Sequence, residues 1–376
     1  MIQLVELGAE YKALKKEIDE SIAGVLAGGH YILGENVQAL ENETSRFIGT
    51  KYAVGVASGT DALLLALIAL GVSKSDEVIT TPFTFISTAE VIARIGARPV
   101  FVDIDEKTFN INISQIEKKI SSRTKAIIPV HLYGQSAQMD GILDISRKYG
   151  IKVIEDACQA LGAEYITSGG VRKKSGSIGN AGCLSFFPTK NLGACGDGGM
   201  ILTDNSEVAE NVRILRAHGS RRKYFHEAHG FNSRLDELQA AILRVKFKHL
   251  AEWSERRRKN AEKYNELFSI KKYADLVRTP FVSQNCTHIY HQYTIRVKNR
   301  DKVQAHLKKK GIVTAVHYPI PLHLQPVFAN LGYKDGDFPV SEKVSKEVLS
   351  LPAHPYLSGQ DIVSVVNAVG EALANE

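Results

Sequence analysis

One lysine of the chain, Lys190, stands in a segment whose composition suits chemistry on a carbonyl group. Pro188 lies two positions before it, and four glycines follow between positions 193 and 199. The flanking segments 181–187 and 200–203 are small and apolar enough to form buried strands. Burial lowers the pKa of an amine and frees its neutral form, which Schiff-base formation requires. An ordinary solvated loop lysine is the alternative, and this segment alone does not decide between the two.

A carboxylate, Asp156, follows the apolar segment 151–155, which is typical of a buried strand. A carboxylate in that place needs a cation or hydrogen-bond donors, because an unpaired buried charge is costly. No lysine or arginine is adjacent to it in sequence. Asp156 could hold the N–H of a pyridinium ring and so keep that ring an electron sink. A salt bridge to a distant residue is the alternative.

Three further segments place polar or aromatic residues directly after predicted strands. Residues 58–61, Ser-Gly-Thr-Asp, open a helix and could bind a phosphate at its N-terminus, or could simply cap that helix. Phe85 could stack on a planar ring or pack in the core. Residues 131–135 could face a ligand or satisfy the hydrogen bonds of their own turn.

The elements that must position these residues alternate regularly between strand and helix. Apolar strands alternating with helices indicate a parallel sheet covered on both faces, with ligands bound beyond the carboxyl ends of the strands. The predicted strands are 52–57, 78–81, 99–102, 126–130 and 151–155, and the helices between them are 61–70, 87–95, 114–121 and 139–149.

The pattern changes after a long charged helix, 248–268, which is typical of a connector. We expect a large domain over residues 1–247, with N-terminal helices at 8–29 and 35–48, and a connector plus a small α+β domain over 248–376. The elements predicted for the small domain are a strand at 291–297, a helix at 300–310, a strand at 312–316 and a helix at 360–374.

Composition indicates which classes of binding partner suit this chain. The 376 residues carry a mild net charge of +6 without a nucleic-acid-binding motif, so a phosphorylated small molecule fits better than a polynucleotide. The longest apolar run, 62–72, is too short to span a bilayer, and we expect no membrane segment. The four cysteines form no CxxC pair and no metal-binding spacing, so we expect free thiols in a cytoplasmic protein and no metal.

Taken together, these segments resemble the sugar aminotransferases of the DegT/DnrJ/EryC1/StrS family, within fold type I of the pyridoxal phosphate enzymes. The resemblance covers almost the whole chain. It implies an α/β fold: a large domain with a mostly parallel seven-stranded sheet flanked by helices, and a smaller C-terminal α+β domain. The motifs that carry it lie at 58–63, 82–85, 155–160, 185–193, 196–199 and 230–241.

The resemblance implies a role for each cofactor contact. Lys190 would form the internal aldimine with pyridoxal 5′-phosphate and move the proton between the cofactor's C4′ and the substrate carbon. Asp156 would hold the pyridine nitrogen, Gln159 would lie near the ring hydroxyl, and Phe85 would stack on the ring. Cys158 replaces a more frequent alanine, a change that we expect to leave these roles untouched. Three small residues would bind the phosphate: Gly59, Thr60 and Ser185.

Other residues are assigned to the partner subunit and to the substrates. Asn232 would reach the phosphate of the neighbouring subunit, which implies a homodimer with shared active sites. Arg234 would lie toward the amino donor and sugar pocket, although residues 233–236 also have the pattern of a helix-capping box. Three residues of the segment 317–323 would line the same pocket: His317, Tyr318 and His323.

The implied reaction is a ping-pong transfer of the amino group of L-glutamate to a keto group of a nucleotide-diphosphate-linked sugar. The lysine at position 190, in place of the histidine of related dehydratases, favours transamination. Residues 131–135 resemble members acting on 3-keto sugars, so we favour C3 over C4, with UDP and TDP both open. The product would serve amino-sugar biosynthesis, for example of lipopolysaccharide or O-antigen. The alternatives are a 4-keto aminotransferase, a lyase on the same sugars, and a cofactor-bound regulator without turnover.

Overall fold

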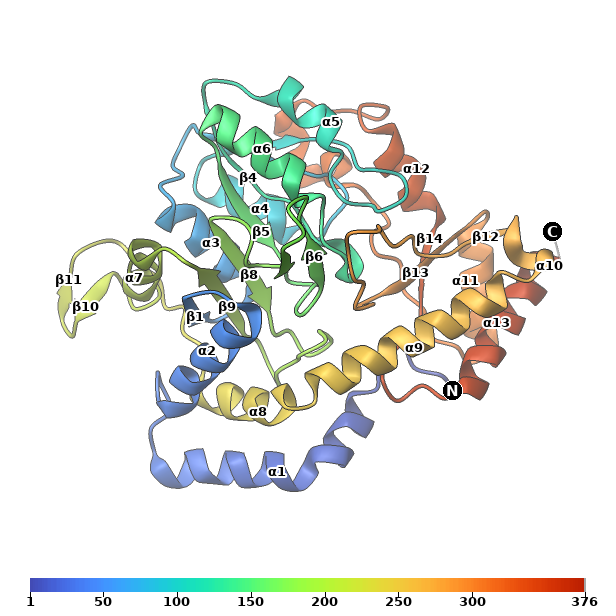
Figure 1. Ribbon diagram of the computed structural model, residues 1–376, viewed down its shortest axis with the longest axis horizontal. Helices are drawn as coiled ribbons and strands as arrows, with labels where there is room; N and C mark the ends of the chain where they lie inside the picture. The colour runs from blue at the N-terminus through green and yellow to red at the C-terminus, as the bar shows by residue number, and fades with distance from the viewer. Residues whose placement is uncertain (375–376) are drawn as a thin grey trace.

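A seven-stranded sheet forms the centre of the computed structural model, which describes residues 1–374 (Figure 1). The strand β9 is antiparallel to both of its neighbours, β1 and β8, and the other pairs are parallel. This confirms the mostly parallel seven-stranded sheet. In spatial order the strands are β1 (Tyr52–Val56), β9 (Gly199–Thr203), β8 (Ala181–Ser185), β5 (Lys152–Asp156), β4 (Thr124–Ile127), β2 (Glu77–Thr80) and β3 (Arg98–Phe101).

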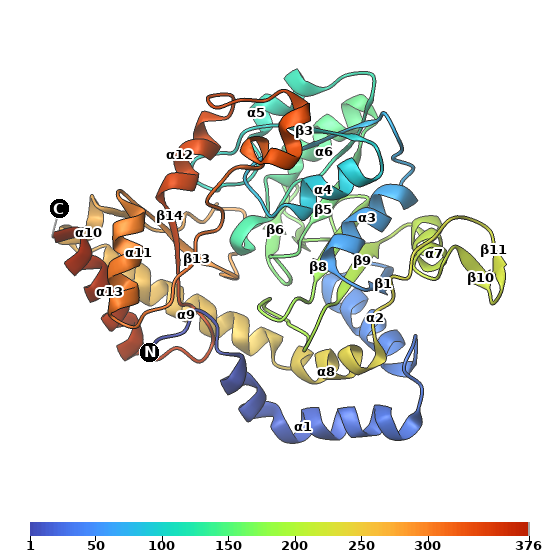
Figure 2. The ribbon, with the colours of Figure 1, turned by 180° about the vertical axis from the view of Figure 1, so that it is seen from behind.

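Helices cover both faces of this sheet because neighbouring residues of each strand are apolar and point in opposite directions. Ile201 packs in one cluster with α3 (Gly59–Ala69), α4 (Ser87–Arg94) and α7 (Ser206–Leu215), on the face seen in Figure 2. Met200 and Leu202 pack on the other face with α2 (Glu35–Ile48) and α8 (Glu237–Phe247). Further along that face, α6 (Met139–Tyr149) covers β4 and β5.

The long helix α9 (Leu250–Phe268) connects this layered part to a second core. Trp253 near its start packs with α8 and with α1 (Leu7–Gly28), whereas Tyr264 and Phe268 belong to the second core. The predicted connector helix is thus one continuous helix that contributes to both cores, as both views show.

The second core surrounds a three-stranded antiparallel sheet of β12 (Val277–Arg278), β13 (Tyr293–Val297) and β14 (Val348–Leu351), packed against α11 (Arg300–Lys309) and α13 (Gly359–Ala374). The strand predicted at 312–316 is wrong. Ile312 and Ala315 form only isolated bridges, to Ile2 and to Ser350 of β14, and the third strand of this sheet is β14 itself.

The domain boundary placed at residue 247 stays a prediction. Between 322 and 347 the chain returns to the large sheet, where Phe328 and Phe338 pack around Phe101 of β3. The elements of this return are η3 (Leu322–Leu324), η4 (Pro326–Leu331) and α12 (Pro339–Glu347).

The remaining elements are short. The helix predicted at 114–121 is α5 (Ile113–Ile116) followed by a 3₁₀ turn, η1 (Glu117–Lys119). A hairpin of β10 (Ser220–Arg222) and β11 (Phe225–His226) projects away from the sheet at the left of Figure 1. The others are η2 (Leu132–Gly134), β6 (Glu164–Ile166), β7 (Arg172–Lys174) and α10 (Lys271–Ala274). Within residues 1–374, every helix is too short or too polar to cross a bilayer.

Candidate active site

A cavity of about 310 Å³ lies beyond the carboxyl ends of β5 and β8, beside the N-terminus of α3. This is the edge at which the sequence pattern predicts a ligand site. Nine of the twelve residues predicted for the site line it: Gly59, Thr60, Phe85, Asp156, Gln159, Ser185, Lys190, His317 and Tyr318.

Lys190 lies in a turn that follows β8, where its backbone N–H donates to the carbonyl of Phe187 (2.8 Å). Its side chain borders the cavity, and loss of solvation lowers the pKa of its amine, although the charges of Cys158 and Asp156 act in the opposite direction. A lowered pKa makes the neutral, nucleophilic amine accessible. These surroundings favour a desolvated lysine over the alternative of an ordinary solvated loop lysine.

Asp156, the last residue of β5, is held by hydroxyl and backbone donors. Its Oδ2 accepts from the Thr88 hydroxyl (2.8 Å), and its Oδ1 accepts from the Cys158 N–H (3.3 Å). No ion pair of the described residues involves Asp156, so the salt-bridge alternative is wrong. Because it borders the cavity without a cationic partner, this carboxylate fits a pyridinium N–H. The sequence did not indicate a role for Thr88, because α4 and β5 come together only in the folded chain.

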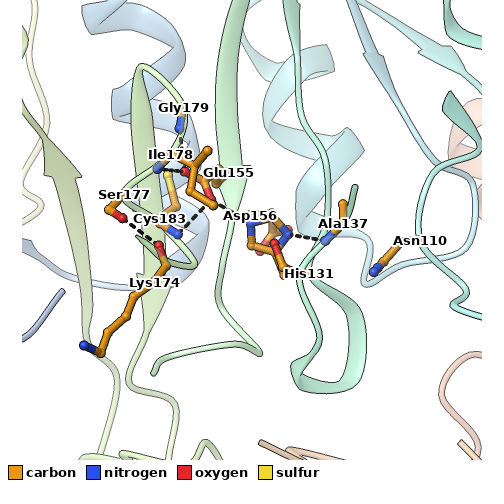
Figure 3. Close-up of polar contacts among 12 residues, drawn as sticks. Asn110, His131, Ala137, Glu155, Asp156, Lys174, Ser177, Ile178, Gly179 and Cys183 are labelled. Atoms are coloured by element: carbon orange, nitrogen blue, oxygen red, sulfur yellow. Dashed lines mark hydrogen bonds and ion pairs between the residues drawn. The ribbon is translucent and has the colours of Figure 1, made fainter. Parts of the chain in front are cut away.

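A buried pair, Glu155 and His131, fixes the backbone beside this carboxylate (Figure 3). The Glu155 carboxylate accepts from His131 Nε2 (2.8 Å) and from three backbone N–H groups of segment 176–179 (2.6 to 2.8 Å). Burial raises the pKa of Glu155, but these donors outweigh burial and lower it overall. The His131 N–H donates to the Asp156 carbonyl (3.0 Å), so His131 satisfies the strand end rather than facing a ligand.

The N-terminus of α3 provides a site for an anion. The Ser58 hydroxyl caps the helix by accepting from the Asp61 N–H (3.1 Å), which confirms the capping alternative for this residue. The Thr60 hydroxyl lies 2.7 Å from the Ser87 hydroxyl. A Cβ on Gly59 would lie 2.6 Å from the Ser185 Cβ, so only glycine lets this turn approach β8 so closely. The remaining hydroxyls and the positive end of the helix dipole fit a phosphate.

Aromatic and amide side chains also line the cavity. Phe85 is 54% exposed beside the cavity, and its ring centroid lies 6.2 Å from that of Tyr318. Phe83 is the phenylalanine of this segment that packs in the core, so the core alternative for Phe85 is wrong. Gln159 accepts from the Tyr133 N–H (2.9 Å) and donates to the Tyr318 hydroxyl oxygen (3.1 Å). Its position near a ring hydroxyl stays a prediction.

Two histidines and one cysteine add to the lining. His317 lies 2.9 Å from the Ser350 hydroxyl, and burial, with the charge of Lys190, lowers its pKa to about 4. His291 borders the same cavity and was missed by sequence reasoning. Cys158 also borders the cavity, and burial raises the pKa of its thiol; that it leaves the roles of the cofactor contacts unchanged stays a prediction. All four cysteines are free thiols.

Three predicted residues do not reach the cavity of their own chain. Asn232 is exposed, and the Arg234 Nε is buried without a hydrogen-bond partner among the described residues. His323 is buried and lies 2.9 Å from the Glu342 carboxylate.

The capping box considered for residues 233–236 is wrong. Helix α8 begins at Glu237, and the residue before it makes no side-chain cap. The Ser233 hydroxyl instead donates to the Asp61 carboxylate (2.6 Å), which ties this segment to the N-terminus of α3.

The chain is similar both to a protein described as a regulator and to a protein described as a sugar aminotransferase. A pleiotropic regulatory protein of Geobacillus stearothermophilus is 51% identical over 98% of each chain. A UDP-2-acetamido-2-deoxy-3-oxo-D-glucuronate aminotransferase of Pseudomonas aeruginosa is 46% identical over 98% of this chain and 99% of the relative.

A solved structure, S. venezuelae DesV in complex with a ketimine intermediate, has the same fold with a TM-score of 0.93. It is 40% identical in sequence, and the match covers 97% of this chain and 96% of that one. The sequence profile of one family matches residues 12–370. The site geometry and these similarities agree that the chain belongs to the DegT/DnrJ/EryC1/StrS aminotransferase family.

Proposed function

We propose that this protein is a pyridoxal phosphate-dependent aminotransferase that aminates C3 of a nucleotide-linked keto-sugar. One observation carries the proposal: an amine of lowered pKa, Lys190, shares a cavity with a carboxylate, Asp156, that has no cationic partner among the described residues. A nucleophilic amine and a receptor for a pyridinium N–H are the two groups this chemistry requires.

We assign each residue of the cavity a separate role in the reaction. When bound, pyridoxal phosphate supplies an electron sink that stabilises negative charge on the substrate carbon. Asp156 would keep the ring nitrogen protonated, and Lys190 would move a proton between the substrate carbon and the cofactor's C4′. Phe85 would stack on the ring. We assign the phosphate to Gly59, Thr60 and Ser185, and the hydroxyls of Thr60 and Ser185 together with the N-terminus of α3 support this assignment.

The substrates follow from the relatives. The P. aeruginosa relative is named for a 3-oxo sugar on UDP, which supports amination at C3 rather than C4. We assign L-glutamate as the amino donor, and His317 and Tyr318 to the substrate side of the cavity.

A homodimer with shared sites completes the assignment. Asn232 is exposed and outside the cavity of its own chain, which supports its use by a neighbouring subunit. Arg234 carries a buried Nε without a hydrogen-bond partner among the described residues, and a substrate group reaching that segment would satisfy it.

The second candidate function is regulatory, because the relative of 51% identity is described as a pleiotropic regulatory protein. A regulator has no need of a nucleophilic amine. The low-pKa environment of Lys190 therefore favours the enzyme.

The decisive experiment is a single turnover with L-glutamate. Protein loaded with pyridoxal phosphate should release one equivalent of 2-oxoglutarate, and Lys190→Ala should reduce this rate by at least about 10³-fold. Lys248→Ala, which removes an exposed lysine, is the control and should react like the wild type. Wild-type protein that binds the cofactor but releases no 2-oxoglutarate would support the regulator instead. A panel of UDP- and TDP-linked 3- and 4-keto sugars then identifies the acceptor.

A further inference from the structure

His291 precedes β13 and borders the cavity. Its Nδ1 lies 3.2 Å from the Oδ1 of Asn191, the residue that follows Lys190. The Asn191 Nδ2 donates to the carbonyl of Ile289 (3.2 Å), so the amide oxygen must be the atom that faces the ring. An amide oxygen only accepts, and His291 Nδ1 therefore carries the hydrogen.

A neutral imidazole with a hydrogen on Nδ1 has its lone pair on Nε2. Burial lowers the pKa of His291 well below its ordinary value, and the neighbouring charges of Lys190, Arg257, His317 and His288 lower it further. The ring thus stays neutral, and its Nε2 acts only as an acceptor. Within residues 1–374 the structure gives Nε2 no hydrogen-bond partner, although the ring borders the cavity.

The donor that fits this acceptor is the amine of Lys190. Among the charges that act on His291, that of Lys190 has the largest effect, and both side chains border the same cavity. Because Lys190 and Asn191 are consecutive, the bond from His291 to Asn191 also fixes the ring relative to the lysine backbone. Both contacts would hold the amine in one place.

We propose that His291 is a positioning residue for Lys190, whose free amine turns within the shared cavity and donates a hydrogen bond to His291 Nε2. The proposal rests on the proposed aminotransferase function, in which Lys190 is free while it moves the substrate proton. His291 takes no proton itself. It holds the amine at the substrate carbon, so that the proton passes between that carbon and the lysine nitrogen.

Two substitutions of His291 test the contributions of its two ring nitrogens separately. In His291→Asn, a short amide can still donate to Asn191 but leaves no acceptor at the place of Nε2. In His291→Gln, the longer amide can place its oxygen near Nε2 but loses the donor to Asn191. The proposal predicts that His291→Asn slows the glutamate single turnover by roughly 10- to 100-fold and that His291→Gln restores much of the rate. A merely structural role for the Asn191 bond predicts the reverse order.

A second measurement uses the cofactor-free protein. Acylation of Lys190, followed by mass spectrometry across a pH series, reports the pKa of its amine. A hydrogen bond to Nε2 stabilises the ammonium form, so the midpoint in His291→Asn should lie below that of the wild type, and His291→Gln should lie between. His288→Gln is the matched control, since His288 is a buried histidine outside the cavity and should leave the midpoint unchanged.

Three results would overturn the proposal: an unchanged midpoint in His291→Asn, a slower turnover in His291→Gln than in His291→Asn, or a defect confined to the sugar half-reaction. The last would show that Nε2 receives a sugar hydroxyl rather than the lysine. The labelling experiment needs no turnover. It therefore tests this contact even if the wild-type protein releases no 2-oxoglutarate and the proposed function fails.

Discussion

Replacing Glu155 by glutamine tests whether the buried pair beside Asp156 holds the strand end in place. The substitution keeps size and shape but converts one acceptor oxygen into a donor NH₂ group. In the wild type, the carboxylate accepts from His131 Nε2 and from three backbone N–H groups of segment 176–179. The best placement of the new amide keeps its oxygen on the N–H groups of Ile178 and Gly179.

The NH₂ group then faces two donors, the Gly176 N–H and His131 Nε2. The imidazole cannot change tautomer, because its Nδ1 accepts from the Ala137 N–H (3.0 Å). Two buried donors are left without acceptors, at about 1–3 kcal/mol each, so we expect a loss of about 2–6 kcal/mol in the free energy of unfolding. In a His131→Phe background, which removes one of these donors, Glu155→Gln should cost less.

Urea unfolding at pH 7 measures this free energy, and Glu117→Gln is the matched control. Glu117 pairs with Lys148 on the exposed surface, where loss of an ion pair costs at most about 1 kcal/mol. Because the pKa of Glu155 is lower in the folded state, it stabilises the fold fully at pH values above the pKa of a glutamate in the unfolded chain, about 4.3. The difference between wild type and Glu155→Gln should therefore shrink as the pH falls below that value. A cost within about 0.5 kcal/mol of the control would refute the reasoning.

Two further substitutions test the site and a buried histidine. Thr88→Val removes the hydroxyl that donates to Asp156. The loss of a hydrogen bond to a charged group should weaken pyridoxal phosphate binding roughly tenfold or more. Unchanged affinity in equilibrium dialysis would contradict this role. Burial lowers the pKa of His288 to about 3, so the unfolded chain binds a proton first as the pH falls. Wild-type stability should drop below pH 6.5 by up to about 1.4 kcal/mol per pH unit through this residue, and urea unfolding of His288→Gln should show a shallower slope.

Local patterns predict much of the site because its parts follow individual strands. Asp156 ends a strand, Lys190 lies in the turn that follows one, and Gly59 opens the next helix. Parallel strands bring their carboxyl ends to one edge of the sheet. Hydrophobic periodicity within a few residues is enough to locate such elements. The order of motifs along the chain then points to one family before any contact is known.

Contacts between distant segments could not be predicted in the same way. Thr88 reaches Asp156 across 68 positions, and His291 reaches Asn191 across 100. The segment 312–316 has the apolar character of a strand but forms only isolated bridges, to Ile2 and to Ser350 of β14. No local pattern encodes these choices, because each depends on which surfaces meet when the chain folds.

The sequence by itself determined the alternation of strands and helices, the family, and the identity of the lysine and carboxylate that carry the chemistry. Only the tertiary structure decided how each is held: Asp156 by a threonine hydroxyl rather than a cation, and Lys190 in a cavity that lowers its pKa. It also removed His323 from the cavity, by burying it against Glu342. The physical reason is that pKa and hydrogen-bond geometry depend on desolvation and on neighbours several ångströms away, which the folded packing alone supplies.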